Sequence, residues 1–228
     1  MEDSKTSTTI DINAFNAENY INRVVNNNKH QLQNCLDIVD TLDIPDDDSI
    51  SRGDVAFLQA VCLDVKPKTI LEIGTWVGRS AYTMTIASNA DVYTCDLNDS
   101  MFIEIEEYSD KIHCHPNTHS DIFLKQKLPK FDMAFIDGFD VNVEDVFNVC
   151  QDSFTLVAHD FFNMNTLEHC KGMAVLWRMV EYANNHGYDY KMYIPKRDWI
   201  PSGCPVFDFG GVNACCGMIK VEKNNGET

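Results

Sequence analysis

Three side chains that can bind a cation or accept a proton follow two apolar runs. Asp137 closes the run "AFID", and His159 and Asp160 close the run "LVAHD". Two carboxylates that face one cleft repel each other unless a cation, a proton or a substrate group lies between them. Asp137 and Asp160 could supply an oxygen-rich site for a divalent ion. His159 could instead be a general base, because imidazole titrates near neutral pH. Simpler roles stay open: a helix cap or cofactor ligand for Asp137, and an ordinary strand-end residue for His159.

A second group of residues surrounds a turn within "TILEIGTWVGRSAYTM", residues 69–84. Glu72 lies near the end of an apolar run, and Gly74 and Gly78 permit tight backbone geometry and the close approach of a ligand. A helix starting near Ser80 would present its free amides to that ligand. Asp96 follows Gly74 by 22 residues, near the spacing of about 20 at which an acid binds ribose hydroxyls in nucleoside-binding folds.

The spacing of the glycines favours a nucleoside ligand without phosphates. A dinucleotide site needs G-x-G-x-x-G to bring the backbone against a pyrophosphate, whereas this turn reads G-x-x-x-G and contains the bulky Trp76. Glu72 would repel a pyrophosphate but attract a sulfonium or ammonium group. S-adenosylmethionine (SAM) meets both conditions. The alternatives are a nicotinamide-dependent oxidoreductase and a non-catalytic module that binds a cofactor or a partner.

Alternating strand and helix patterns must position these residues. Runs rich in β-branched and aromatic residues predict strands at 69–73, 91–96, 111–115, 131–137, 153–160, 188–194 and 212–222. Helix-compatible segments separate the first five, and a longer helix is predicted at 170–186. This alternation predicts an α/β fold with a doubly wound parallel sheet, in which ligands bind beyond the carboxyl ends of the strands. The long segment 195–211, with Trp199, Phe207 and Phe209, could cover an acceptor or simply pack under a loop.

The first 50 residues precede this alternating part. Apolar residues at three- and four-residue spacings predict a helix over about 13–43, and an acidic segment containing Pro45 follows it. Ser51 is a typical N-cap residue for the next helix. We therefore expect a helical N-terminal extension or cap at 1–50 and an α/β domain at 51–228.

Composition argues against two classes of partner. The net charge is −17, with 35 acidic and 18 basic residues, which argues against nucleic acids and anionic membrane surfaces. No apolar run approaches the roughly 18 residues of a membrane span, and the N-terminus lacks a signal-peptide pattern. Nine cysteines without a secretion signal indicate reduced thiols. We expect a cytoplasmic protein that acts on a small molecule, and a homodimer stays open.

The cysteines and histidines do not predict a zinc site. In "HCHPNTH", alternation along a strand puts His113 and His115 on one face and Cys114 on the other, which disfavours a joint site with His119. The adjacent Cys215 and Cys216 also point to opposite faces, so core packing is the expected role of at least one.

The motifs resemble those of a known enzyme family. "LEIGTWVGRSA" resembles the first motif of class I SAM-dependent methyltransferases, closest to the small-molecule O-methyltransferases, in which it reads E-I-G-T-x-x-G-x-S. "FDMAFIDG" and "LVAHDFFN" resemble their fourth- and fifth-strand motifs, and the similarity spans about residues 52–222. The resemblance implies a Rossmann-like sheet of seven strands with the last antiparallel, and O-methylation of a small hydroxylated acceptor. By position, the cofactor would bind at Glu72, Gly74, Thr75, Trp76, Gly78, Ser80 and Asp96, with the adenine near Asn117 and Ser120.

The resemblance also bears on the metal. In metal-dependent relatives, carboxylates at the ends of the fourth and fifth strands and a nearby Asn hold a divalent ion, which would place Mg²⁺ at Asp137, Asp160 and Asn163. The match is incomplete, because Phe161 stands where catechol-type relatives have Asn. Asp140 stands where another branch has His. The need for a metal therefore stays open at this point.

Overall fold

One seven-stranded sheet organises the part of the chain that the computed structural model describes, residues 20, 23–24, 26–41, 50–98, 109–138, 141–160, 171–193 and 216–224. The strands are β1 (Thr69–Ile73), β2 (Asp91–Cys95), β3 (Ile112–His115), β4 (Phe131–Ile136), β5 (Cys150–Ala158), β6 (Tyr188–Tyr193) and β7 (Gly217–Lys223). Their order is β3-β2-β1-β4-β5-β7-β6. β7 is antiparallel to both β5 and β6, and the pairs from β3 through β5 are parallel. The Rossmann-like sheet with an antiparallel last strand is thus confirmed.

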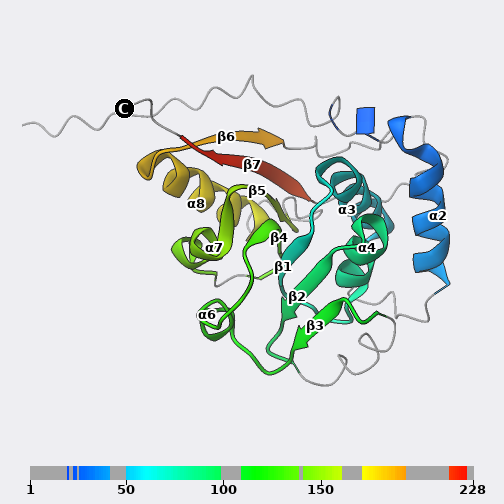
Figure 1. Ribbon diagram of the computed structural model, residues 1–228, viewed down its shortest axis with the longest axis horizontal. Coiled ribbons are helices and arrows are strands. Elements are labelled where there is room, and N and C mark those ends of the chain that lie inside the picture. Colours follow the sequence, from blue (N-terminus) through cyan, green and yellow to red (C-terminus); the bar gives the residue numbers. More distant parts are fainter. Residues whose placement is uncertain are drawn as a thin grey trace, which may run out of the picture.

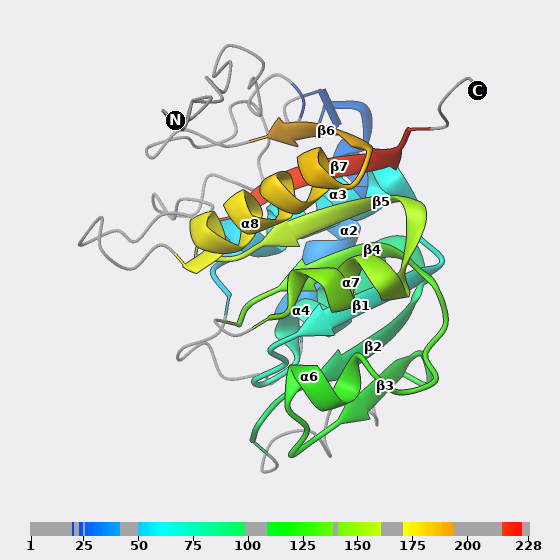
Figure 2. The same ribbon diagram turned by 90° about the vertical axis from the view of Figure 1, so that its left-hand side faces the viewer.

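Helices cover both faces of the sheet (Figures 1 and 2). One face carries α2 (Lys29–Asp40), α3 (Arg52–Val65) and α4 (Arg79–Ser88), and the other carries α6 (Ser120–Phe123), α7 (Val143–Val149) and α8 (Lys171–Asn185). Because side chains alternate across a strand, Ile70 and Phe135 join the core on the α3 and α4 side, whereas Leu71 and Ile136 join the core on the α7 and α8 side.

The helices before β1 form a local layer. α2 packs against both α3 and α4. The start of α3 is a capping box, in which the Ser51 hydroxyl accepts from the Asp54 amide at 3.2 Å and the Asp54 carboxylate accepts from the Ser51 amide at 3.3 Å. The predicted N-cap is therefore confirmed. The early part of the predicted helix at 13–43 falls largely outside the described residues, and the domain boundary near residue 50 stays a prediction.

One strand begins earlier than the sequence pattern predicts. β5 begins at Cys150 rather than near residue 153. Cys150 pairs with Phe131 of β4, and residues 151–153 that follow it are exposed and polar, so they show no apolar pattern. His113 packs on Tyr93, which lies on the α7 side, whereas Cys114 packs against the opposite core, as alternation predicted.

Cys216 is fully buried, in line with a packing role, while Cys215 and the segment 195–211 lie outside the described residues. None of the described helices combines the length and apolar character that a membrane span requires.

Candidate cofactor and active site

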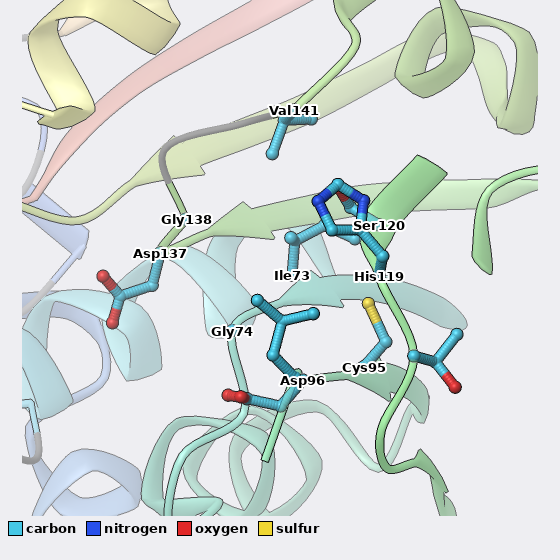
Figure 3. Close-up of a pocket in the computed structure, with 11 residues that line it drawn as sticks. Ile73, Gly74, Cys95, Asp96, His119, Ser120, Asp137, Gly138 and Val141 are labelled. Atoms are coloured by element: carbon cyan, nitrogen blue, oxygen red, sulfur yellow. The ribbon is translucent and has the colours of Figure 1, made fainter. Parts of the chain in front are cut away.

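A cavity opens at the carboxyl ends of β1, β2 and β4, where the strand order reverses. β1 is followed in the chain by β2 on one side, whereas β4 flanks it on the other. Ligands bind at such a switch point in doubly wound sheets. The cavity measures about 280 Å³, near the lower end of the range for small-molecule sites. Its lining comes from the ends of β1, β2 and β4, from the start of α6 with the two residues before it, and from Val141 before α7: Ile73, Gly74, Cys95, Asp96, Leu97, Thr118, His119, Ser120, Asp137, Gly138 and Val141 (Figure 3).

Gly74 lies where the ends of β1, β2 and β4 meet. Its backbone has φ +93°, and its amide donates to the Cys95 carbonyl at 2.9 Å. The Asp137 amide donates in turn to the Ile73 carbonyl at 2.8 Å. A Cβ at position 74 would lie 2.6 Å from the Asp137 carbonyl oxygen. Only glycine therefore fits here, both because of its φ and because the β4 backbone passes so close.

Asp96 holds the turn that follows β1. Its Oδ2 accepts from the amides of Thr75 and Trp76 at 2.9 and 2.8 Å, and its Oδ1 accepts from the Asn98 amide at 3.0 Å. The spacing to Gly74 had predicted only a ribose contact. A carboxylate offers about four lone-pair directions, so Asp96 can fix the turn and still accept hydroxyl groups of a ligand.

Glu72 is the penultimate residue of β1, just before this turn. It is fully buried, and neither of its carboxylate oxygens has a hydrogen-bond partner. Burial raises its pKa to about 8; the nearby Ser80 and Thr94 hydroxyls act in the opposite direction, and the charges of Asp137 and Asp96 add to the rise. The acid is therefore largely protonated at neutral pH in the ligand-free protein. A buried acid without a partner is costly, and a positively charged ligand group nearby would favour its ionised form.

The other predicted cofactor residues lie around these three. Ser120 lines the cavity. Thr75, Gly78 and Ser80 form the turn and the start of α4, and Trp76, with φ +48°, is 40% exposed. Asn117 has φ +50° and precedes the lining residues Thr118 and His119.

Sequence reasoning missed Leu97, a lining residue that is 65% exposed. The sequence signal that could have identified it is an apolar residue directly after the strand-end acid Asp96, in the polar segment "DLND". Its apolar surface beside Asp96 suits the flat face of a base next to a ribose.

The three candidate catalytic residues lie beside the cavity. β4 pairs with β5 through Ile136 and Ala158, so the residues that follow both strands are neighbours. His159 Nδ1 lies 3.2 Å from Asp137 Oδ1 and 3.6 Å from Asp160 Oδ1. One ligand atom of each of these three residues lies within 4.8 Å of the others. The structure thus brings together the three predicted residues. Asn163, the predicted third oxygen ligand, lies outside the described residues.

Asp54 is a fourth member of this group that sequence reasoning missed. Its Oδ2 lies 3.3 Å from His159 Nε2, on the side of the ring away from Asp137. Burial lowers the pKa of His159, but the carboxylates of Asp137 and Asp54 together raise it further, to about 11. In the absence of another cation the imidazole is therefore charged at neutral pH. In that state it relieves the repulsion between the acids, and it cannot accept a proton as a base.

Comparisons with known proteins support the fold. No protein-family model matches the chain, and no curated protein matches it in sequence. The SAH-bound methyltransferase PaMTH1 of Podospora anserina superposes with a TM-score of 0.56 at 16% identity, covering 86% of this chain and 88% of its own. An O-methyltransferase from Bacillus cereus in complex with SAH gives 0.55 at 16%, covering 91% and 100%. The O-methyltransferase TomG from Streptomyces achromogenes, in complex with SAM, gives 0.55 at 15%, covering 85% and 90%. The chain has the fold of these SAM-dependent methyltransferases.

Proposed function

We propose that this protein transfers a methyl group from SAM to a hydroxyl oxygen of a small acceptor. One observation carries the proposal. Asp137 lines the cavity together with Gly74 and Asp96, and its carboxylate also contacts His159. In Figure 3 its side chain extends away from His119 and Ser120. A single residue thus borders both the site suited to a nucleoside and the group of ionisable side chains.

We call the part of the site that would bind SAM the cofactor half; it consists of the turn after β1 and the residues around it. Asp96 would bind the ribose while it holds the Thr75 and Trp76 amides in place. Glu72 would favour the positive charge of the sulfonium or the ammonium group, because a cation stabilises its ionised form. Leu97 and Ser120 would lie near the adenine. Methyl transfer from a sulfonium is an in-line displacement, so the rigid β1–β4 junction at Gly74 would contribute mainly by alignment.

The acceptor half offers a donor set that fits a divalent ion. Asp137 and Asp160 supply carboxylates, and His159 Nδ1 is a buried nitrogen without an aligned hydrogen-bond partner. We propose that these residues hold Mg²⁺ or a similar ion, with Asn163 as a further oxygen ligand. When bound, the ion would lower the pKa of the acceptor hydroxyl. His159 is less suited to the role of free general base, because its carboxylate neighbours keep it protonated.

Two observations disfavour other readings. β7 runs antiparallel between β5 and β6, whereas the dinucleotide-binding sheet of nicotinamide enzymes has the order 3-2-1-4-5-6 without this insertion. The net charge of −17 favours a small acceptor over a nucleic acid. The remaining alternative is a module that binds SAM without catalysis. Only a measurement of turnover distinguishes such a module from an enzyme.

Calorimetric titration of the full chain with SAM, SAH and NAD tests the cofactor. We expect SAM and SAH to bind and NAD not to bind. Binding of NAD alone would favour the oxidoreductase and overturn the proposal. SAH formation from SAM with a library of phenols, catechols and other hydroxylated compounds then tests catalysis. Binding of SAM without SAH formation from any acceptor class would favour the non-catalytic module.

A further inference from the structure

The buried carboxylate of Asp54 connects the start of α3 to the reacting group. It is 1% exposed. Its Oδ2 contacts the Ser51 hydroxyl at 2.6 Å and His159 Nε2 at 3.3 Å, and its Oδ1 accepts from the Cys216 thiol at 3.3 Å. Of these partners only the imidazole can carry a positive charge. α3, β5 and the start of β7 therefore meet at one carboxylate.

Helix capping does not explain this arrangement. The residue at position N3 of a capping box, here Asp54, needs only to accept a hydrogen bond from the N-cap amide. A solvent-exposed acid can do this. Here the acid is buried, and burying a carboxylate is costly unless it is paired and hydrogen-bonded. The contacts to His159 and Cys216 lie 105 and 162 residues away in the chain and are not part of the cap. They indicate a second role for Asp54.

We propose that Asp54 is a positioning residue that holds the His159 ring with Nδ1 facing Asp137 and Asp160, so that His159 provides a nitrogen ligand to the divalent ion bound there. The inference rests on the proposed metal site and names a residue outside it. His159 bridges the two sides, with Nε2 at 3.3 Å from Asp54 and Nδ1 at 3.2 Å from Asp137.

The physical reason lies in the two nitrogens of imidazole. A histidine that binds a metal through one nitrogen usually donates its other N–H to a carboxylate, which fixes the ring and the tautomer and makes the ligating nitrogen more basic. Asp54 occupies the place of that carboxylate. With Nε2–H directed at Asp54, the lone pair of Nδ1 faces the acids. Removal of such an outer carboxylate typically weakens metal affinity by about 10- to 100-fold.

Mn²⁺ binding to the full chain tests the inference without any methyl acceptor. Electron paramagnetic resonance measures the free ion and hence the affinity, and electron spin echo modulation reports a nitrogen bound to Mn²⁺. We expect a nitrogen coupling in the wild type that disappears in His159→Ala. Asp54→Asn should bind Mn²⁺ about 10- to 100-fold more weakly. In the His159→Ala background the same change should have no further effect, because Asp54 acts through His159.

Two matched variants separate this role from capping and from charge. Ser51→Ala removes the cap hydroxyl but leaves the Asp54 carboxylate, so the melting temperature should fall while Mn²⁺ affinity stays within about twofold. Asp64→Asn removes one negative charge from the same helix, where Asp64 pairs with Lys220, and should leave Mn²⁺ affinity similarly unchanged.

The outcomes distinguish the inference from the function on which it rests. Mn²⁺ binding without a nitrogen coupling in the wild type would overturn the role of Asp54 and His159 while the carboxylate site stands, and it needs no variant to fold. Equal affinities of folded Asp54→Asn and wild type would do the same. No Mn²⁺ binding by the wild type would overturn both the inference and the proposed metal site.

Discussion

Replacing the buried acid Glu72 with glutamine should change how the stability of the ligand-free protein depends on pH. Glu72 is fully buried, and its pKa rises from 4.5 to about 8 on folding, chiefly through burial. Between these values the folded chain keeps a proton that the unfolded chain has released. The free energy of unfolding therefore falls as pH rises through this range and levels off above about pH 8. Glutamine has no such proton.

The magnitude follows from the two pKa values. At about 1.4 kcal/mol per pH unit, the contribution of Glu72 to the free energy of unfolding falls by about 3 kcal/mol between pH 4.5 and 7. Urea unfolding of wild type and Glu72→Gln at half-unit pH steps would give the difference between them directly. We expect this difference to grow in favour of the variant by about that amount and then to flatten.

The control is Glu181→Gln, which removes an exposed acid from α8. It shows how the free energy of unfolding depends on pH when an acid is lost from the surface. A difference between Glu72→Gln and wild type that does not vary with pH from 4.5 to 8 would refute the reasoning. It would mean that Glu72 is already ionised in the folded protein and has a partner there. Glu72→Gln should also bind SAM more weakly than the wild type, since an amide cannot attract the cationic groups of the ligand.

Three other changes test the site. Asp96→Ala should weaken SAM binding by about 1.5–3 kcal/mol, or 10- to 150-fold by calorimetry, since the ribose contact and the hold on the turn are both lost; unchanged affinity in a folded variant would exclude this placement. Gly74→Val should abolish SAM binding with a native-like circular dichroism spectrum, because its Cβ would meet the Asp137 carbonyl at 2.6 Å; normal binding would contradict the described junction. Asp160→Asn should lower turnover at least about 100-fold while SAM affinity barely changes, and a loss of SAM binding instead would place Asp160 in the cofactor half.

Local patterns were sufficient for the parallel strands and for the turn after β1, whereas the antiparallel last strand was expected only from the resemblance to the methyltransferases. The apolar run before Gly74 and the distance to Asp96 placed both residues at neighbouring strand ends, because parallel strands end at the same edge of a sheet. The same reasoning placed Asp137 beside Asp160. Boundaries were less accurate where pairing continues without an apolar pattern. The start of β5 is the example, because residues 151–153 are exposed and polar and give no strand pattern in the sequence.

The environment of His159 could not be predicted from the sequence. Asp54 lies in the segment "SRGD", where its spacing from Ser51 indicates only a helix cap. Nothing local shows that this helix end meets the end of β5, 105 residues later. Sequence reasoning therefore treated the repulsion between Asp137 and Asp160 as a reason for an external cation. The structure adds a cation that belongs to the chain itself. His159 lies between three carboxylates and can carry a positive charge.

The central claim is that the nucleoside cavity and the ionisable group act as one catalytic site joined at Asp137. The most direct measurement is transfer of a ¹³C-labelled methyl group from SAM to a hydroxylated acceptor, followed by mass spectrometry for wild type and Asp137→Asn. The account predicts labelled methyl ether in the wild type and at least about 100-fold less in the variant. Parallel titrations should show nearly equal SAM affinity for both proteins. Equal methyl transfer by the two proteins would contradict the account, because Asp137 would then have no part in the reaction.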